Sequence, residues 1–114
     1  MLRELVEFQK RTFDLAQEAW PDDKPSRELA DALSARLFEE GGELSRAVRR
    51  YGRKRFGHPG EGEGTAQEVA DEIGDVLFLL ARIANLCKIP LDYAAQKVID
   101  KITDRLARRA RGCE

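Results

Sequence analysis

The sequence predicts an all-α fold, a compact bundle of four helices, from two observations. Ala, Leu, Arg and Glu dominate the composition, whereas the β-branched residues that favour strands are scarce. The four prolines are Pro21, Pro25, Pro59 and Pro90. Each stands where the helical spacing of apolar residues lapses, so the prolines mark breaks between helices. The chain has the length of one domain, and we expect residues 1–114 to form a single domain.

The first two helices are expected over residues 2–19 and 27–50. The first carries apolar residues at the spacing of one helical face. The second follows Ser26, whose hydroxyl can cap the first turn. Its apolar stripe consists of Leu29, Leu33, Leu37, Leu44 and Val48.

A glycine-rich loop over residues 53–64 separates these helices from the remaining two. The third helix begins at Thr65, which forms a capping-box pattern with Glu68, and runs to about Lys88. It is apolar on most of its circumference, so we expect it to be covered on more than one side. The fourth spans residues 91–110. Its residues expected to face inward are Ala94, Ala95, Val98, Ile102 and Leu106.

Charge and hydropathy exclude several classes of partner. The 20 basic and 21 acidic residues almost balance, which argues against binding to nucleic acid. The longest uncharged apolar stretch ends at Arg82 and is far shorter than the roughly 20 residues of a membrane helix. Cys87 and Cys113 match no metal spacing, so we expect free thiols, with Cys87 buried, in a cytoplasmic protein.

Acidic residues occupy core-facing positions of the second helix. At 100° per residue, Glu40 lies in the same stripe as Leu33, Leu37 and Leu44, within about 40°. Glu43 is three residues further on, so both carboxylates can converge on one point, and Glu39 lies beside them.

The third helix carries a second acidic face that continues into its apolar stripe. Its members, at i, i+3, i+4 and i+7, are Glu68, Asp71, Glu72 and Asp75. Burying like charges is costly unless a cation neutralises them. Oxygen ligands without His or Cys indicate Mg²⁺ or Mn²⁺ rather than zinc. The alternative is a solvated acidic face, which is strained for Glu40 and Glu72 because their positions belong to apolar stripes.

Three glycines accompany these acids inside the two helices. Gly41, Gly42 and Gly74 each cost about 1 kcal/mol relative to alanine. Their presence indicates that side-chain bulk is excluded there, as when a ligand or another helix approaches closely.

The motifs EEGGE at positions 39–43 and EVADEIGDVL at positions 68–77 resemble the signature of the all-α MazG-type nucleoside triphosphate pyrophosphohydrolases, EExxE followed by ExxD. The resemblance continues through the Trp20 segment and the KIPLD turn at positions 88–92. It implies Mg²⁺-dependent (or Mn²⁺-dependent) hydrolysis of (deoxy)nucleoside triphosphates to a monophosphate and pyrophosphate, in nucleotide-pool house-cleaning.

The resemblance also implies roles for individual residues. Glu39 would orient or deprotonate the attacking water, Trp20 would stack on the base, and Lys101 would contact phosphate. A core position for Trp20 and a solvated one for Lys101 are the alternatives. Glu68 and Asp71 would support the ligands from outside. The metal ligands would be Glu40, Glu43, Glu72 and Asp75.

Two other functions remain open at this point. One is the related phosphoribosyl-ATP pyrophosphohydrolase, although the Trp20 segment favours the general enzyme. The other is a helical interaction module whose acids are remnants. The broad apolar surface of the third helix and the resemblance both indicate a homodimer or homotetramer.

Overall fold

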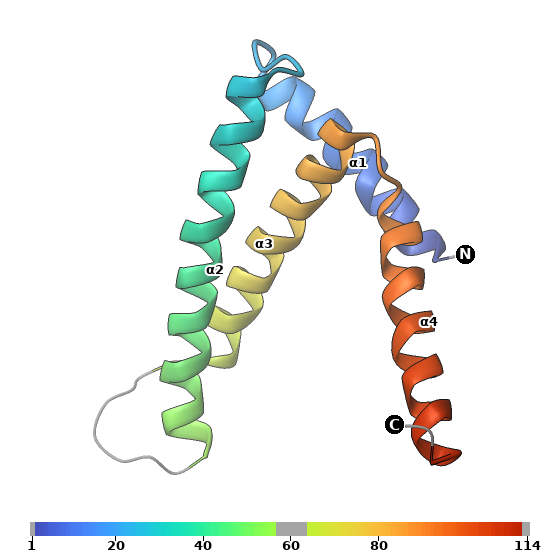
Figure 1. Ribbon diagram of the computed structural model, residues 1–114. Coiled ribbons are helices and arrows are strands. Elements are labelled where there is room, and N and C mark those ends of the chain that lie inside the picture. The colour runs from blue at the N-terminus through green and yellow to red at the C-terminus, as the bar shows by residue number, and fades with distance from the viewer. Residues whose placement is uncertain (1, 57–63, 113–114) are drawn as a thin grey trace.

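The computed structural model describes residues 2–56 and 64–112 (Figure 1). Its helices confirm the all-α class: α1 (Arg3–Ala19), α2 (Arg27–Arg55), α3 (Ala66–Cys87) and α4 (Leu91–Ala110). Three of them match the predicted bounds closely. The second continues past position 50, because the Arg and Lys residues there are good helix formers, and ends where Phe56 N–H donates to Gly52 O at 2.8 Å. Most of the predicted loop, residues 57–63, lies outside the described residues.

Both predicted N-caps form, but only one of the two hydrogen bonds of the capping box is present. The Ser26 hydroxyl accepts from Leu29 N–H at 3.1 Å, and Thr65 Oγ1 accepts from Glu68 N–H at the same distance. The Glu68 carboxylate does not complete the box. It pairs instead with Arg50 of α2, at 3.5 Å, and so ties the first turn of α3 to the last turns of α2.

The core lies between α2 and α3, which run side by side, and α1 crosses α3 (Figure 1). Three of its members are alanines, whose small side chains let the helices approach closely. This core is small, so most apolar side chains of the described chain remain partly exposed. The buried residues on these helices are Thr12, Leu33, Ala47, Leu79, Ala81 and Ala84.

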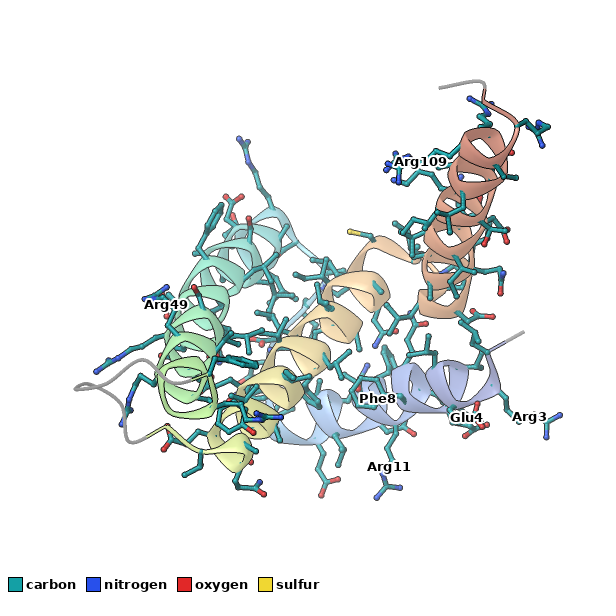
Figure 2. All side chains as sticks on the ribbon, turned by 90° about the horizontal axis from the view of Figure 1, so that it is seen from below. Arg3, Glu4, Phe8, Arg11, Arg49 and Arg109 are labelled. Atoms are coloured by element: carbon teal, nitrogen blue, oxygen red, sulfur yellow. The ribbon has the colours of Figure 1, made fainter. Side chains whose placement is uncertain are left out.

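The position of α4 departs from the predicted compact bundle. It packs on α1 rather than along α2 and α3, and stands apart from that pair (Figures 1 and 2). The radius of gyration is 17.8 Å, against about 13 Å for a compact domain of this length. The predicted inward-facing Val98, Ile102 and Leu106 are 44%, 47% and 56% exposed. Within one chain the prediction that this face is buried is therefore wrong.

The direction of α4 follows from the turn that precedes it. Lys88 adopts the left-handed conformation (φ 57°) and ends α3. The side chain of Gln9 on α1 then holds both sides of the turn. Its Nε2 donates to Ile89 O at 2.9 Å, and its Oε1 accepts from Leu91 N–H at 2.6 Å. These bonds direct α4 along α1 and away from the core.

The same turn leaves Cys87 exposed, so the prediction that it is buried is wrong. Cys87 is the last residue of α3, at the point where α4 leaves the helix pair. Cys113 lies outside the described residues. Among the described helices, none has the length and apolar character needed to cross a membrane.

Candidate metal site

Three carboxylates from two helices meet on the α2–α3 pair. Glu40 and Glu43 are one turn apart on α2, and Glu72 projects from α3. One oxygen of each lies within 4.8 Å of the others. Glu40 and Glu72 are half-buried, whereas Glu43 is exposed. The side-by-side packing of the two helices thus joins two acidic motifs that are distant in the sequence.

Two of these carboxylates have an oxygen without a partner. Glu40 Oε2 and Glu72 Oε2 are buried and accept no hydrogen bond. The other oxygen of Glu40 has a long contact of 3.4 Å with Arg36. An anionic oxygen removed from water without a donor is costly, and a solvated acidic face would not contain such atoms. Their chemistry fits a hard divalent cation.

The electrostatics of the cluster favour the protonated form of Glu72. Burial raises the pKa of this carboxyl above its ordinary value of 4.5, because desolvation penalises the charged form. Repulsion from neighbouring carboxylates adds to the effect, in the order Glu43, Asp75, Glu40 and Asp71. A bound cation would favour the charged form and so oppose both contributions.

Asp75 borders the three-acid cluster. It lines, with Glu40, a cleft of about 250 Å³, and its charge acts on Glu72. Glu39 is exposed on α2 beside Glu40 and is not one of the three clustered acids. The two outer acids of α3 have other contacts. Glu68 pairs with Arg50, and Asp71 accepts from Gln67 Nε2 at 2.8 Å.

The two predicted substrate contacts lie in different places. Trp20 is 41% exposed and lines the same cleft as Glu40 and Asp75, which is not the position of a core tryptophan. Phe78 of α3 lies 6.5 Å from it, with the rings tilted by 59°. Lys101 is exposed on α4, which does not line this cleft. A phosphate contact by Lys101 at this site therefore requires a second copy of the chain.

The glycines beside the acids face open space. A Cβ atom at Gly41, Gly42 or Gly74 would meet nothing within 4 Å. Close approach by another helix of the same chain is therefore not the reason for these glycines. The space over the acids is free for a ligand or for a partner chain.

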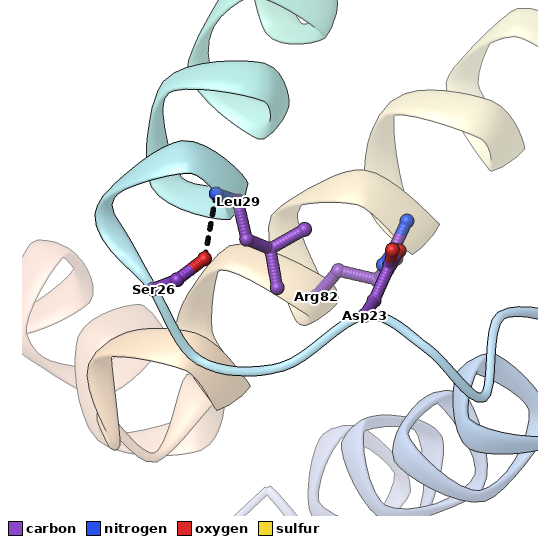
Figure 3. A network of polar contacts seen from close by, with 4 residues as sticks. All are labelled: Asp23, Ser26, Leu29 and Arg82. Carbon is purple, nitrogen blue, oxygen red and sulfur yellow. Dashed lines mark hydrogen bonds and ion pairs between the residues drawn. The ribbon is translucent and has the colours of Figure 1, made fainter.

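The sequence analysis assigned no role to Arg82, which lines the cleft from α3. Its side chain is only 10% exposed, and its Nη2 donates to Asp23 Oδ2 at 3.1 Å (Figure 3). The signal was visible, because Arg82 interrupts the most apolar stretch of the sequence. A charge at such a position needs a specific partner.

Comparison with known proteins agrees with this arrangement. The family model of the MazG nucleotide pyrophosphohydrolase domain matches residues 26–113, which include all the clustered acids but not Trp20. The uncharacterized protein YpjD of Bacillus subtilis (strain 168) is 43% identical over 75 residues, 65% of this chain and 64% of YpjD. The uncharacterized protein YvdC of the same organism is 39% identical over 75 residues, 60% of this chain and 68% of YvdC.

The chain thus matches somewhat less than two thirds of the length of YpjD. No solved structure matches significantly. The family model covers well over half of the chain, and the acids that it spans are those that the fold brings together. The chain belongs to the MazG nucleotide pyrophosphohydrolase family.

Proposed function

We propose that the chain hydrolyses (deoxy)nucleoside triphosphates between the α- and β-phosphorus, with Mg²⁺ or Mn²⁺, to a monophosphate and pyrophosphate. The observation that carries this proposal is the pair of buried, unpartnered oxygens of Glu40 and Glu72 within the acid cluster. The family supports the class of reaction. Removal of modified or excess nucleotides from the pool is the corresponding cellular role.

The residues of this chain would have separate roles in metal binding, proton transfer and base recognition. Glu40, Glu43, Glu72 and Asp75 would hold the cation and fix its position between α2 and α3. When bound, the cation supplies charge neutralisation of the triphosphate and lowers the pKa of water. Glu39, exposed beside this cluster, would accept the proton of the attacking water. Trp20 offers an aromatic surface to the base at the edge of the cleft.

A second copy of the chain would cover the exposed apolar face of α4 and supply a phosphate contact. The apolar stripe of α4, defined by Val98, Ile102 and Leu106, is about half exposed among the described residues of one chain. Lys101 flanks this stripe, so a partner that covers the stripe brings the ammonium group close to another chain. We expect a homodimer or homotetramer in which Lys101 contacts phosphate in the cleft of a neighbouring copy.

The related phosphoribosyl-ATP pyrophosphohydrolase activity is the second candidate among enzymes. The position of Trp20 in the cleft suits either substrate, since both present a base for stacking, so the two are separated by the substrate screen. An interaction module with remnant acids would leave the unpartnered oxygens of Glu40 and Glu72 without a purpose.

A substrate screen tests the proposal. The purified chain is incubated with each (deoxy)nucleoside triphosphate and with phosphoribosyl-ATP, and pyrophosphate and orthophosphate are measured separately. We expect pyrophosphate as the first product, loss of activity with EDTA, and recovery with Mg²⁺ or Mn²⁺. Activity that survives chelation, or orthophosphate as the first product, would refute it. Glu40→Gln is the control for a contaminating hydrolase.

A further inference from the structure

The connection between α1 and α2, residues 20–26, is fastened to α3 through the side chain of Arg82. The guanidinium makes two contacts with this connection. Its Nη2 donates to Asp23 (Figure 3), and its carbon lies 4.5 Å from the centroid of the Trp20 ring. One side chain therefore holds two points of the connection that carries the candidate base-stacking residue.

The chemistry of these contacts favours arginine. A planar guanidinium can stack on an indole and donate from its edge to a carboxylate at the same time, whereas an ammonium group lacks the planar surface for stacking. Asp23 balances the charge that would otherwise be uncompensated at a side chain with only 10% exposure. The remaining N–H groups are not among the buried unpartnered atoms of the described chain, and the side chain lines the cleft.

The Trp20–Arg82 pair stands between two hollows. On one side is the cleft that contains Glu40 and Asp75. On the other is a mainly apolar pocket of about 110 Å³, whose walls include Phe13. The position of the indole ring thus decides the shape of both hollows, and the guanidinium covers one of its faces.

Resting on the proposed function, we infer that Arg82 is a positioning residue for nucleotide recognition: it fixes Trp20 at the edge of the acid cleft so that an indole surface is ready for the base. Without Arg82, binding of the nucleotide would have to order the Trp20 ring and residues 20–26. The free energy spent on this ordering would lower the affinity for the nucleotide. The acids that hold the cation lie on α2 and α3 and do not depend on this contact. The loss should therefore appear in binding and not in the chemical step.

Fluorescence tests the contact between Arg82 and Trp20, because the chain has a single tryptophan. In metal-free protein, we expect Arg82→Met to increase acrylamide quenching and to shift the emission to longer wavelength. Asp23→Ala removes the acceptor of the same anchor from the exposed side and should act in the same direction with little risk to folding. Arg11→Met, on an α1 side chain that points away from the other helices (Figure 2), is the control. Unchanged Trp20 fluorescence in both folded variants would overturn the inference.

A titration with nucleotide tests the role in recognition. Trp20 fluorescence is followed while Mg²⁺ and the α,β-imido analogue of each deoxynucleoside triphosphate are added. Loss of a desolvated cation–π contact should raise the dissociation constant of Arg82→Met by about tenfold. Arg82→Lys should recover part of this loss, and Arg11→Met should bind as wild type does.

Hydrolysis provides the decisive comparison. We expect Arg82→Met to raise KM by about tenfold while kcat stays near wild type. An unchanged dissociation constant and KM, or a loss confined to kcat, would overturn the inference. Nucleotide binding by the wild type without any hydrolysis would refute the proposed function alone. Absence of nucleotide binding to the wild type would overturn both.

Discussion

Glu40 of α2 and Glu72 of α3 bring carboxylate oxygens within 4.8 Å of each other, and each keeps one buried oxygen without a hydrogen bond. In the metal-free protein these charges push apart the two helices that form most of the core. A cation bound between them would turn the repulsion into a link between α2 and α3. The stability of the fold and the occupancy of the site should therefore be coupled.

Glu40→Gln and Glu72→Gln should abolish activity and leave the metal-free protein as stable as wild type, or more stable. The amide keeps the shape of the carboxylate and removes one of the repelling charges. Activity should fall by more than about 100-fold, since even indirect partners of metal ligands are worth 10–100-fold. With Mg²⁺ at a hundred times its dissociation constant, wild type gains about 2.7 kcal/mol, and the variants gain less. Thermal melts with EDTA and with Mg²⁺ measure both effects.

Glu39→Gln is the matched control for these melts. Its carboxylate is exposed and outside the three-acid cluster, so both melting temperatures should stay at the wild-type values while turnover falls. If Glu40 were instead a structural partner of Arg36, Glu40→Gln would destabilise by about 1–3 kcal/mol with or without Mg²⁺. Such a loss in EDTA, together with retained hydrolysis, would end the metal-site interpretation.

The raised pKa of Glu72 predicts how metal-free stability changes with pH. The folded state binds the proton of the Glu72 carboxyl more tightly than the unfolded state does. The charged carboxylate therefore lowers the free energy of unfolding, and this penalty is complete above the folded pKa. It decreases as the pH falls through that value and vanishes below the ordinary value of 4.5. The stability advantage of Glu72→Gln over wild type should therefore shrink on acidification. Chemical denaturation of both proteins in EDTA across this range measures it; an advantage that grows at low pH contradicts the assignment.

The affinity for Mg²⁺ should weaken over the same range of pH. Protons compete with the cation for Glu72, because a carboxylate ligand must be deprotonated. Calorimetric titration of wild type at several pH values should show weaker binding and greater proton release as the pH approaches the pKa of Glu72. Binding that is independent of pH would show that Glu72 is not a ligand.

Ile102→Glu should dissociate the proposed oligomer. The substitution places a charge in the middle of the α4 stripe, where Ile102 is 47% exposed in one chain and would be buried between copies. Ala107→Glu, about 140° away around the same helix, is the matched control and should leave the assembly intact. Light scattering at micromolar concentration measures the mass. A 13 kDa particle for wild type would refute the oligomer.

Mixing two inactive variants tests whether Lys101 acts in a neighbouring copy. Glu40→Gln loses the acid site, and Lys101→Ala loses the phosphate contact. If each cleft uses acids from one chain and Lys101 from another, heterodimers regain one intact cleft. Mixed and re-equilibrated dimers should then recover about a quarter of wild-type activity by symmetry. No recovery, although exchange of subunits is demonstrated, would place both residues in the same chain's site. Full activity of Lys101→Ala on its own would remove Lys101 from the site.

The sequence was sufficient for features that depend on local physics. The helical spacing of apolar residues predicted all four helices, and the capping hydroxyls predicted where α2 and α3 begin. The acids within apolar stripes indicated that Glu40 and Glu72 are partly buried carboxylates that need a partner. The placement of α4 was not accessible in this way. Its apolar stripe predicts a buried face, but such a stripe does not reveal whether the same chain or a second chain packs against it. Arg82 was missed for a related reason, because its partners lie about 60 positions away.

The contacts of Gln9 have a further consequence for the position of α4. A single amide on α1 fixes the exit angle of α4 through Ile89 O and Leu91 N–H, and it touches none of the acids. Substitution at this position should change the direction of α4, and with it the position of Lys101, while the acids on α2 and α3 keep their places. The orientation of α4 thus depends on one side chain that lies outside the acid cluster.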